Sequence, residues 1–428
     1  MTGFPHPDPL PEGERSEGLG VKVAATFSVT RRTSANILPD STFTRLNQPG
    51  LSTPAFIYDE SLIAQRLAAL QTVKRLCPLK VLYSVKALPF LPLLEKLRPQ
   101  LDGFAVSSLF EAKLATAAGA EPAGLHITTP GLRAEDMDEI AGLCGYLSYN
   151  SLSQWRHLQP LAQNRLNAGL RVNPECSFLD DARYDPCRPH SKLGVPLSQL
   201  SARLTAGDPL LDEVQGIHFH NIFQSRHFQP LAQTLAKIEH ALGGWLYRLQ
   251  WINLGGGYVW DTPQELADLA EIILRLCGER RLAVFFEPGK AIVGAAGFLA
   301  TRVLDVFDSG GKTLAVLDTS VNHHPEVFEY QRSPRLLNES RHGVHRVVLA
   351  GGTCLAGDVF GEYRLAALPR IGDMMVFADV GAYSLIKANR FNGHNFPSIY
   401  ALDAAGKLHR QKTYTYEDYL RQWSGDAA

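Results

Sequence analysis

The sequence predicts an α/β protein in which a (β/α)8 TIM-type barrel is followed by an all-β C-terminal domain. Eight short runs of apolar and β-forming residues recur between residues 81 and 289, and the first five begin 21 to 23 residues apart with helical patterns between them. From about residue 300 the runs follow one another with turn signals and few helical stretches. Eight strand–helix alternations over roughly 220 residues are what a closed parallel barrel requires. An open doubly wound sheet is the weaker alternative.

The eight predicted strands all end in small or polar residues. In chain order they are "VLYSVK" (81–86), "GFAVSS" (103–108), "LHITTP" (125–130), "YLSYNS" (146–151), "GLRVNP" (169–174), "GIHFHN" (216–221), "WINLGGG" (251–257) and "VFFEPG" (284–289). The intervening segments carry helical patterns such as "PLLEKLRPQL" and "SLFEAKLATAAG", and Gly119 is a suitable C-terminal cap for the second of these. In the last part of the chain "TRVLDVFD", "KTLAVLDT", "HRVVLAGG" and "DMMVFADV" are predicted strands.

The N-terminal part of the chain differs from the rest. Residues 1–42 begin with a stretch rich in proline, glycine and charge and lack periodicity, so we expect a disordered extension. The segment "PHPDPLPEGER" resembles a translated bacterial repeat element, which leaves the true N-terminus open. We expect residues 43–57 to add an edge strand to the β domain, residues 58–299 to form the barrel and residues 300–428 to form the C-terminal β domain.

Composition argues against several classes of function. The 42 Lys and Arg residues balance 43 Asp and Glu residues, and a formal net charge of −1 gives no general attraction to nucleic acids or anionic membranes. No apolar stretch approaches the roughly 20 residues that span a bilayer. Six scattered cysteines without a C-x-x-C pair are typical of reduced thiols in the cytosol. We therefore expect a cytoplasmic protein without a metal site, a nucleic-acid partner or a membrane partner.

In a barrel of this kind, functional residues lie at the carboxyl ends of the strands. Those ends collect residues with chemical capability: Lys86, Ser107 and Ser108, Thr128 and Thr129, Arg171 and Asn173, His218 and His220, Gly255 to Gly257, and Glu287. Each has a plainer interpretation when taken alone. In these interpretations the strand reaches the protein surface at Lys86 and the glycines form a turn. Glu287 and Arg171 form structural ion pairs, and the histidines are buried with their hydrogen bonds satisfied.

The combination favours chemistry, because a lysine, a glycine loop and a carboxylate are together what pyridoxal 5′-phosphate needs. Lys86 would form the Schiff base, and the glycine loop would bring backbone N–H groups close to the phosphate. Glu287 would keep the pyridinium nitrogen protonated, so that the ring acts as an electron sink. Strand alternation places His218 and His220 on the same side.

Several motifs spread over residues 50 to 400 resemble those of fold-type III pyridoxal-phosphate-dependent decarboxylases. They are "YSVKALPF", "LDGFAVSSLFEAKLA", "GIHFHN", "NLGGG", "EPGKAIV", "GGTCLAGDVFGEY" and "FNGHNFPS". Within this family, "RVNPE" with "YDPCRPHSKLG" and "GGTCLAGD" resemble the polyamine branch that acts on carboxynorspermidine and carboxyspermidine. Diaminopimelate enzymes usually carry Cys-Glu-Ser where this chain has Cys354, Leu355 and Ala356.

The resemblance implies a role for each matching position. The implied cofactor-binding residues are Lys86 as the Schiff-base lysine, His220 stacked on the ring, Glu287 at the ring nitrogen, Gly255, Gly256 and Gly257 with Tyr383 at the phosphate, and Arg171. Cys354 is the implied proton donor to the carbanion carbon after CO2 leaves. Asp358 and Glu329 are implied to bind the distal amine of a polyamine substrate. In this family the segment with Cys354 reaches the partner's active site, so the resemblance implies a homodimer with shared sites.

Some positions depart from the family pattern and leave the exact substrate open. Lys290 follows "EPG" where many relatives have arginine, "NIFQS" lacks the common Gly-Ser phosphate contact, and His323 and His324 have no assigned role. The alternatives are another decarboxylase of the fold, acting on diaminopimelate, ornithine or a secondary-metabolite amino acid, and a catalytically silent pyridoxal-phosphate-binding homologue. A racemase of the same barrel type is disfavoured, because racemases usually place an arginine where Glu287 stands.

Overall fold

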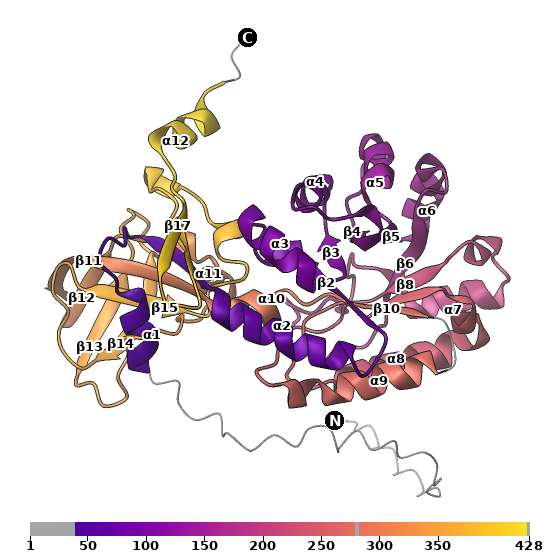
Figure 1. Cartoon of the computed structure of the whole chain (residues 1–428), viewed down its shortest axis with the longest axis horizontal. Helices are drawn as coiled ribbons and strands as arrows, with labels where there is room; N and C mark the ends of the chain where they lie inside the picture. Colours follow the sequence, from indigo (N-terminus) through magenta and orange to yellow (C-terminus); the bar gives the residue numbers. More distant parts are fainter. Residues whose placement is uncertain (1–38, 279–281, 426–428) are drawn as a thin grey trace, which may run out of the picture. The chain divides into compact units, whose positions relative to one another are not determined.

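The computed structural model describes residues 39–278 and 282–425 (Figure 1). Most of the segment for which disorder was expected, residues 1–38, lies outside the described residues. The last four residues of the expected segment 1–42, residues 39–42, begin helix α1 (Pro39–Leu46). The expected strand over residues 43–57 is therefore wrong in its first part, and strand β1 is confined to Ala55–Asp59.

The first sheet is the predicted barrel. Its eight parallel strands are β2 (Leu79–Ser84), β3 (Gly103–Val106), β4 (Leu125–Thr128), β5 (Tyr146–Tyr149), β6 (Asn167–Asn173), β8 (Gly216–His218), β9 (Trp251–Asn253) and β10 (Ala283–Phe286). The order β5-β4-β3-β2-β10-β9-β8-β6 closes because β5 also pairs with β6, and the short β7 (Val195–Pro196) is added beside β6. The barrel prediction is confirmed, and the open doubly wound alternative is wrong.

Helices between these strands cover the barrel (Figure 1). They are α2 (Glu60–Lys74), α3 (Leu91–Leu97), α4 (Leu109–Ala117), α5 (Met137–Leu143), α6 (Leu152–Leu158), α7 (Leu197–Thr205), α8 (Gln229–Leu242), α9 (Ala267–Cys277) and α10 (Lys290–Val293). Side-chain caps fix several of their starts, as where Ser108 accepts the N–H of Glu111 at α4 and Ser151 accepts that of Gln154 at α6. Gly119 follows α4 with a φ of +85°, as its predicted capping role requires.

The interior of the barrel is filled by a large aromatic side chain that two glycines admit. Trp251 is buried and packs with Leu82 and Phe285. A Cβ on Gly216 would lie 2.0 Å from the indole ring, and one on Gly169 would lie 2.4 Å from it. Glycine at these two strand positions therefore allows Trp251 to close the barrel beneath the strand ends.

The second sheet confirms the predicted β domain. It contains β1, β11 (Gly297–Ser309), β12 (Lys312–Leu317), β13 (His345–Ala350), β14 (Val359–Leu365), β15 (Met374–Ala378), β16 (Ser398–Leu402) and β17 (Leu408–Lys412). Strand β1 pairs antiparallel with β11 and parallel with β16, so it lies inside the sheet and not at the expected edge. All five of its residues are buried, as an interior strand requires.

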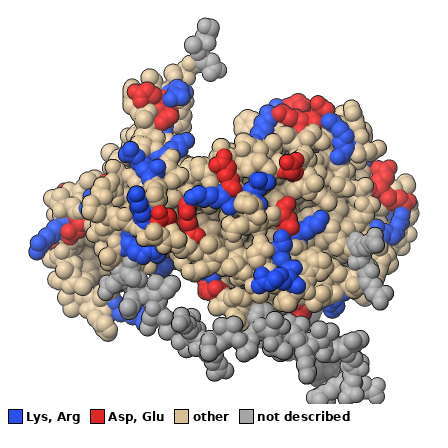
Figure 2. Space-filling view, in the orientation of Figure 1, with Lys and Arg blue, Asp and Glu red and all other residues tan. Residues whose placement is uncertain are grey.

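The connections of the β domain contain short helices. They are η11 (Val321–His323), α11 (Glu326–Tyr330) and, after β17, α12 (Tyr416–Trp423). Acidic and basic side chains are interspersed on the face in Figure 2, in line with the near-zero net charge. Within residues 39–278 and 282–425, no helix combines the length and apolar character needed to cross a membrane.

Candidate active site

A cavity of about 430 Å³ opens at the carboxyl ends of the barrel strands. Residues from both sheets' connections line it, among them Lys86, Glu287 and Gly257 from the barrel and Tyr330 and Tyr383 from the β domain. Of the residues predicted at the strand ends, the structure brings Lys86, His220, Gly257 and Glu287 together at this cavity.

Lys86 stands on a single 3-10 turn, Val85–Ala87, directly after β2. The N–H of Tyr383 donates to the carbonyl of Ala87 at 2.9 Å, which ties this turn to the β domain. The Lys86 side chain is accessible inside the cavity, with protein on all sides. Burial lowers the pKa of Lys86, the nearby Arg171 lowers it further, and the carboxylate of Glu287 opposes the shift. A lowered pKa increases the fraction of the amine that is neutral, and therefore nucleophilic, near pH 7.

Glu287 follows β10 and lines the same cavity, with its side chain 10% exposed. Its Oε1 accepts a hydrogen bond of 2.7 Å from Nδ2 of Asn253, and its Oε2 lies 3.7 Å from Nε2 of His218. Burial raises the pKa of Glu287, while the charge of Lys86 and the hydrogen bond from Asn253 oppose the shift. A buried carboxylate beside an amine that is accessible from the cavity is the charge arrangement predicted for the site.

His220 and Arg171 lie beside this pair. Nδ1 of His220 accepts the N–H of Gly256 at 3.1 Å, so the neutral ring carries its proton on Nε2. Burial, together with the charges of Lys86 and Arg171, lowers the pKa of His220 to about 3. Arg171, on β6, has no ion pair within 4 Å among the described residues, which removes the structural ion-pair interpretation. Burial lowers its pKa, and the carboxylate of Glu287 opposes the shift.

The three glycines after β9 do not all face the cavity, as a common role at a phosphate would require. The N–H of Gly255 donates to Oδ1 of Asn253 at 2.9 Å and that of Gly256 to His220, so neither is free for a phosphate. Of the three, only Gly257 lines the cavity. A Cβ at any of these positions would lie 2.1 to 2.4 Å from a backbone oxygen of a neighbouring loop. The glycines are needed mainly because the loops approach so closely.

Two further residues that line the cavity could meet an anion. Tyr383 has a φ of +60°, and burial raises its pKa to about 12, so the phenol stays protonated and can donate. Lys290 lies 3.1 Å from the buried carboxylate of Glu326. Sequence reasoning missed Glu326, and it also missed Glu111, whose carboxylate accepts the N–H of Ser107 and acts on the charge of Lys86. The Ser-x-x-Glu capping box of α4 was the available signal for Glu111.

The mouth of the cavity is aromatic. The rings of Tyr184, Phe223 and Tyr330 lie 4.9 to 5.8 Å apart, and Phe223 and Tyr330 line the cavity. Glu329, a predicted substrate-binding residue, lies beside this group and pairs with Lys387 at 2.5 Å, and both side chains are more than a third exposed. Glu329 is thus near the mouth, but its charge is already partnered by a lysine that lines the cavity.

Cys354 and Asp358 lie in the loop between β13 and β14. Cys354 is exposed and does not line the cavity of its own chain. Asp358 is 2% exposed and accepts hydrogen bonds from the N–H of Val321 at 2.8 Å and from the N–H and hydroxyl of Thr353 at 3.1 and 2.5 Å. This geometry contradicts a substrate-binding role for Asp358. Its carboxylate instead fixes the loop that presents Cys354.

The two unassigned histidines face different neighbours. Nδ1 of His323 bonds to the hydroxyl of Thr319 at 3.0 Å, and Nδ1 of His324 bonds to that of Ser384 at 2.9 Å. Burial lowers the pKa of each to about 4. Both are therefore neutral buried groups, and His324 ties η11 to the residue after Tyr383.

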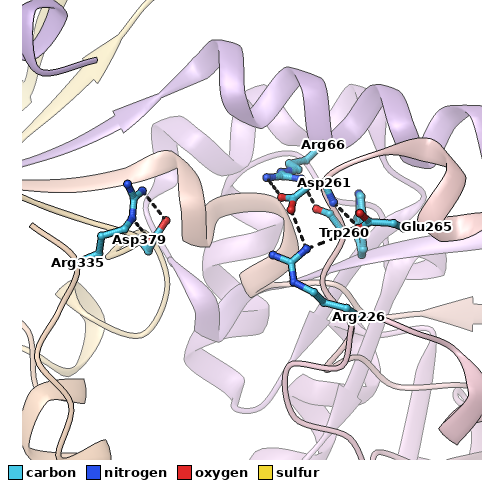
Figure 3. A network of polar contacts seen from close by, with 7 residues as sticks. All are labelled: Arg66, Arg226, Trp260, Asp261, Glu265, Arg335 and Asp379. Atoms are coloured by element: carbon cyan, nitrogen blue, oxygen red, sulfur yellow. Dashed lines mark hydrogen bonds and ion pairs between the residues drawn. The ribbon is translucent and has the colours of Figure 1, made fainter. Parts of the chain in front are cut away.

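Ion pairs anchor the loop that follows the glycines (Figure 3). Asp261 receives hydrogen bonds from Arg66 on α2 at 2.6 Å and from Arg226 at 2.7 Å, and Arg66 also donates to the carbonyl of Trp260. A pair of backbone bonds between Ser225 and the segment 257–259 joins the same two loops. The cavity wall around Gly257 is therefore held from outside the barrel.

The side chains present fit pyridoxal phosphate. An accessible lysine amine of lowered pKa lies near a buried carboxylate, a neutral histidine lies beside them, and the cavity wall includes Gly257, Tyr383 and Lys290, whose ammonium pairs with Glu326. These groups match an aldehyde, an aromatic ring with a basic nitrogen, and a phosphate.

Comparison with known proteins also indicates an enzyme that uses pyridoxal phosphate. Residues 61–294 match the family model "Pyridoxal-dependent decarboxylase, pyridoxal binding domain". The chain is 34% identical to a carboxyaminopropylagmatine decarboxylase of Synechocystis sp., over 87% of this chain and 97% of that protein. It is 31% identical to a carboxynorspermidine/carboxyspermidine decarboxylase of Herminiimonas arsenicoxydans, over 87% of this chain and 100% of that protein.

Among solved structures, carboxynorspermidine decarboxylase from Campylobacter jejuni, complexed with norspermidine, is similar with a TM-score of 0.76. It is 28% identical, and the match covers 87% of this chain and 100% of that one. The family model covers more than half of the chain, and the relatives match along nearly their whole length. The protein belongs to the family of pyridoxal-dependent decarboxylases, and pyridoxal phosphate is its cofactor.

Proposed function

We propose that the protein decarboxylates a carboxylated polyamine, carboxynorspermidine or carboxyspermidine, and releases norspermidine or spermidine. The observation that carries the reaction type is that Lys86 and Glu287 line one cavity and act on each other's charge. The polyamine substrate is supported by the relative from H. arsenicoxydans and by the norspermidine complex of the similar C. jejuni enzyme. Diaminopimelate decarboxylases match at 24% to 27% identity, which argues against that alternative substrate.

When bound, pyridoxal phosphate supplies an electron sink for the pair left behind by CO2. The protein's own groups prepare and protect that chemistry. Lys86 offers an amine of lowered pKa, and Glu287 provides a fixed negative charge for the ring nitrogen. His220 presents a neutral ring at the site, and Gly257, which lines the cavity, is the one glycine of the loop that we assign to the phosphate.

A second candidate substrate is carboxyaminopropylagmatine, because the relative from Synechocystis has that activity in its name at 34% identity. The two candidates differ at the end remote from the carboxylate, where one has an ammonium and the other a guanidinium. An aromatic wall formed by Tyr184, Phe223 and Tyr330 suits either cation through cation–π contact. The substrate therefore has to be determined by turnover.

The deciding experiment incubates purified holoenzyme with carboxynorspermidine, carboxyspermidine, carboxyaminopropylagmatine and diaminopimelate and follows CO2 together with the amine product. We expect the highest kcat/KM with one of the two carboxylated triamines. A higher value with carboxyaminopropylagmatine would replace the proposal by the second candidate. Turnover of diaminopimelate alone, or of none of the four compounds, would contradict both.

We also propose a homodimer in which Cys354 serves the partner's site as proton donor. Its exposure outside its own chain's cavity supports this, as does the loop that Asp358 holds in place. Mixing the inactive variants Lys86→Ala and Cys354→Ala should restore about a quarter of the activity, since half of the dimers would then hold one intact site. Activity that stays at the level of the separate variants would contradict shared sites.

The balanced charge and scattered cysteines support a cytoplasmic location without nucleic-acid or membrane partners.

A further inference from the structure

A chain of buried polar groups crosses the barrel beneath the cavity. It runs from Ser148 on β5 through His126 on β4 and Asn253 on β9 to Glu287, with separations of 2.8, 3.0 and 2.7 Å. The first three residues are at most 1% exposed. Polar groups buried this deeply in a core of Trp251 and Phe285 are costly unless each is satisfied, so the arrangement needs an explanation.

One backbone group sets the direction of the whole chain. The N–H of Gly255 donates to Asn253, so the amide oxygen Oδ1 must face Gly255. The amide nitrogen Nδ2 then faces Glu287 and His126, and its two hydrogens serve one acceptor each. Nδ1 of His126 is therefore an acceptor, its proton is on Nε2, and that N–H donates to Ser148.

Packing holds the histidine ring in this orientation. Its centroid lies 4.9 Å from that of Trp251 and 5.7 Å from those of Tyr146 and Phe285. Burial lowers the pKa of His126 to about 3. A protonated ring, or one with its proton on Nδ1, would present an N–H to the N–H of Asn253, and a flipped ring would present a C–H, so neither could accept this hydrogen bond.

Glu287 has one direct side-chain donor in the described part of the chain, which is Asn253. His218 faces the other carboxylate oxygen at 3.7 Å, beyond hydrogen-bond distance, and neither of its ring nitrogens has a hydrogen-bond partner among the described residues. Asn253 thus controls the carboxylate position and joins it to the glycine loop through Gly255.

We propose that Asn253 is the positioning residue of the cofactor site, and that His126, backed by Ser148, fixes the direction of its amide. In this arrangement one side chain sets both the carboxylate that meets the ring nitrogen and the start of the loop that reaches the phosphate. The inference concerns the orientation of the cofactor. It holds for any substrate that the enzyme accepts.

The first test measures the ring in the wild-type protein and uses a variant only to assign its signal. Holoenzyme labelled with 15N-histidine is studied by NMR between pH 6 and 9, and the signal that disappears in His126→Gln is assigned to His126. We expect a neutral ring with its proton on Nε2 throughout this range. A proton on Nδ1, or titration of the ring between pH 6 and 9, would overturn the proposal even if the variants below do not fold.

The second test removes the donor. In Asn253→Leu the side-chain size is nearly kept but all three hydrogen bonds are lost, and we expect binding of pyridoxal phosphate to weaken about 10- to 100-fold, as expected for a lost bond to a charged group. The kcat should fall while the substrate KM changes less than about twofold, because no substrate contact is removed. The matched control is Asn338→Leu, since the amide of Asn338 also donates and accepts hydrogen bonds, but to backbone groups of the β domain. Wild-type cofactor affinity in a folded Asn253→Leu protein would overturn the proposal.

Discussion

The inner end of the cavity and its mouth are built in different ways. At the inner end, Glu287 and His220 are fixed by hydrogen bonds to Asn253 and to the N–H of Gly256, and the groups behind them are fully buried. At the mouth, Glu329 and Lys387 form an exposed ion pair on connecting segments, next to three aromatic rings that contact one another. The inner end is thus pre-organised for one cofactor, whereas the mouth can change without disturbing the chemistry. We expect variants at the inner end to change kcat and variants at the mouth to change KM.

The largest effect is expected for Lys86→Ala, which removes the amine of lowered pKa from the inner end. The kcat should fall by at least about a thousandfold, because the nucleophile that holds the cofactor is lost. Steady-state CO2 release measures this, with circular dichroism as the check on folding. Near-normal turnover by the folded variant would contradict the assignment.

Glu287→Gln should have the next largest effect. The amide keeps the shape of the side chain but removes the negative charge, and we expect kcat to fall by about a hundredfold, as when a preorganised electrostatic partner is lost. The matched comparison is Glu329→Gln at the mouth, for which kcat should change less than about threefold. Equal losses of kcat in the two variants would remove the distinction between the two ends.

Lys387→Met tests the mouth. Lys387 forms an ion pair with Glu329 and adds a positive charge to the cavity wall. Its removal should therefore lower the KM for a cationic substrate by about two- to fivefold and leave kcat unchanged. Lys312→Met is the matched control, since Lys312 forms a similar ion pair with Glu362 on the β domain. A higher KM in Lys387→Met would argue that Glu329 does not bind the substrate.

The smallest effect is expected for Asp261→Asn, in the ion-pair cluster outside the glycine loop. Burial alone would raise the pKa of Asp261, but hydrogen bonds from Arg226 and Arg66 lower it. The stabilisation is therefore present above the unfolded-state pKa and is lost as the pH falls through the lower folded-state value. We expect a loss of up to about 1 kcal/mol in the free energy of unfolding at pH 7 and a smaller loss at about pH 3, below the unfolded-state pKa. Urea titrations at both pH values measure it, with Asp212→Asn as a control for an exposed pair. An equal loss at pH 3 would contradict the assigned charge effect.

The barrel was predictable because its strands repeat at a regular spacing and each ends in polar residues. The same rule located Lys86 and Glu287, and closure of the predicted barrel makes their strands, the first and the eighth, neighbours, as β2 and β10 are. The expected edge strand was misplaced because β1 pairs with two strands that lie more than 240 residues further along the chain. Long-range pairing of this kind leaves no local pattern.

The hydrogen-bond partners were the least predictable part of the site. His126 and Asn253 stand inside apolar runs, where a polar residue is indistinguishable from an ordinary satisfied core residue. Asp358 was assigned to the substrate by resemblance, but its loop folds back so that Val321 and Thr353 occupy both carboxylate oxygens. All three glycines were assigned to the phosphate from the sequence. Their close approach to the loops after β8 and β10 appears only in three dimensions, so the sequence could not reveal it.

The most direct test of the central claim is to reduce the holoenzyme with borohydride and to map the labelled peptide. Three lysines line the cavity, Lys86, Lys290 and Lys387, so the outcome is not trivial. We predict a single pyridoxyl label, on Lys86. A label on Lys290 or Lys387, or no label on any of the three, would contradict the account.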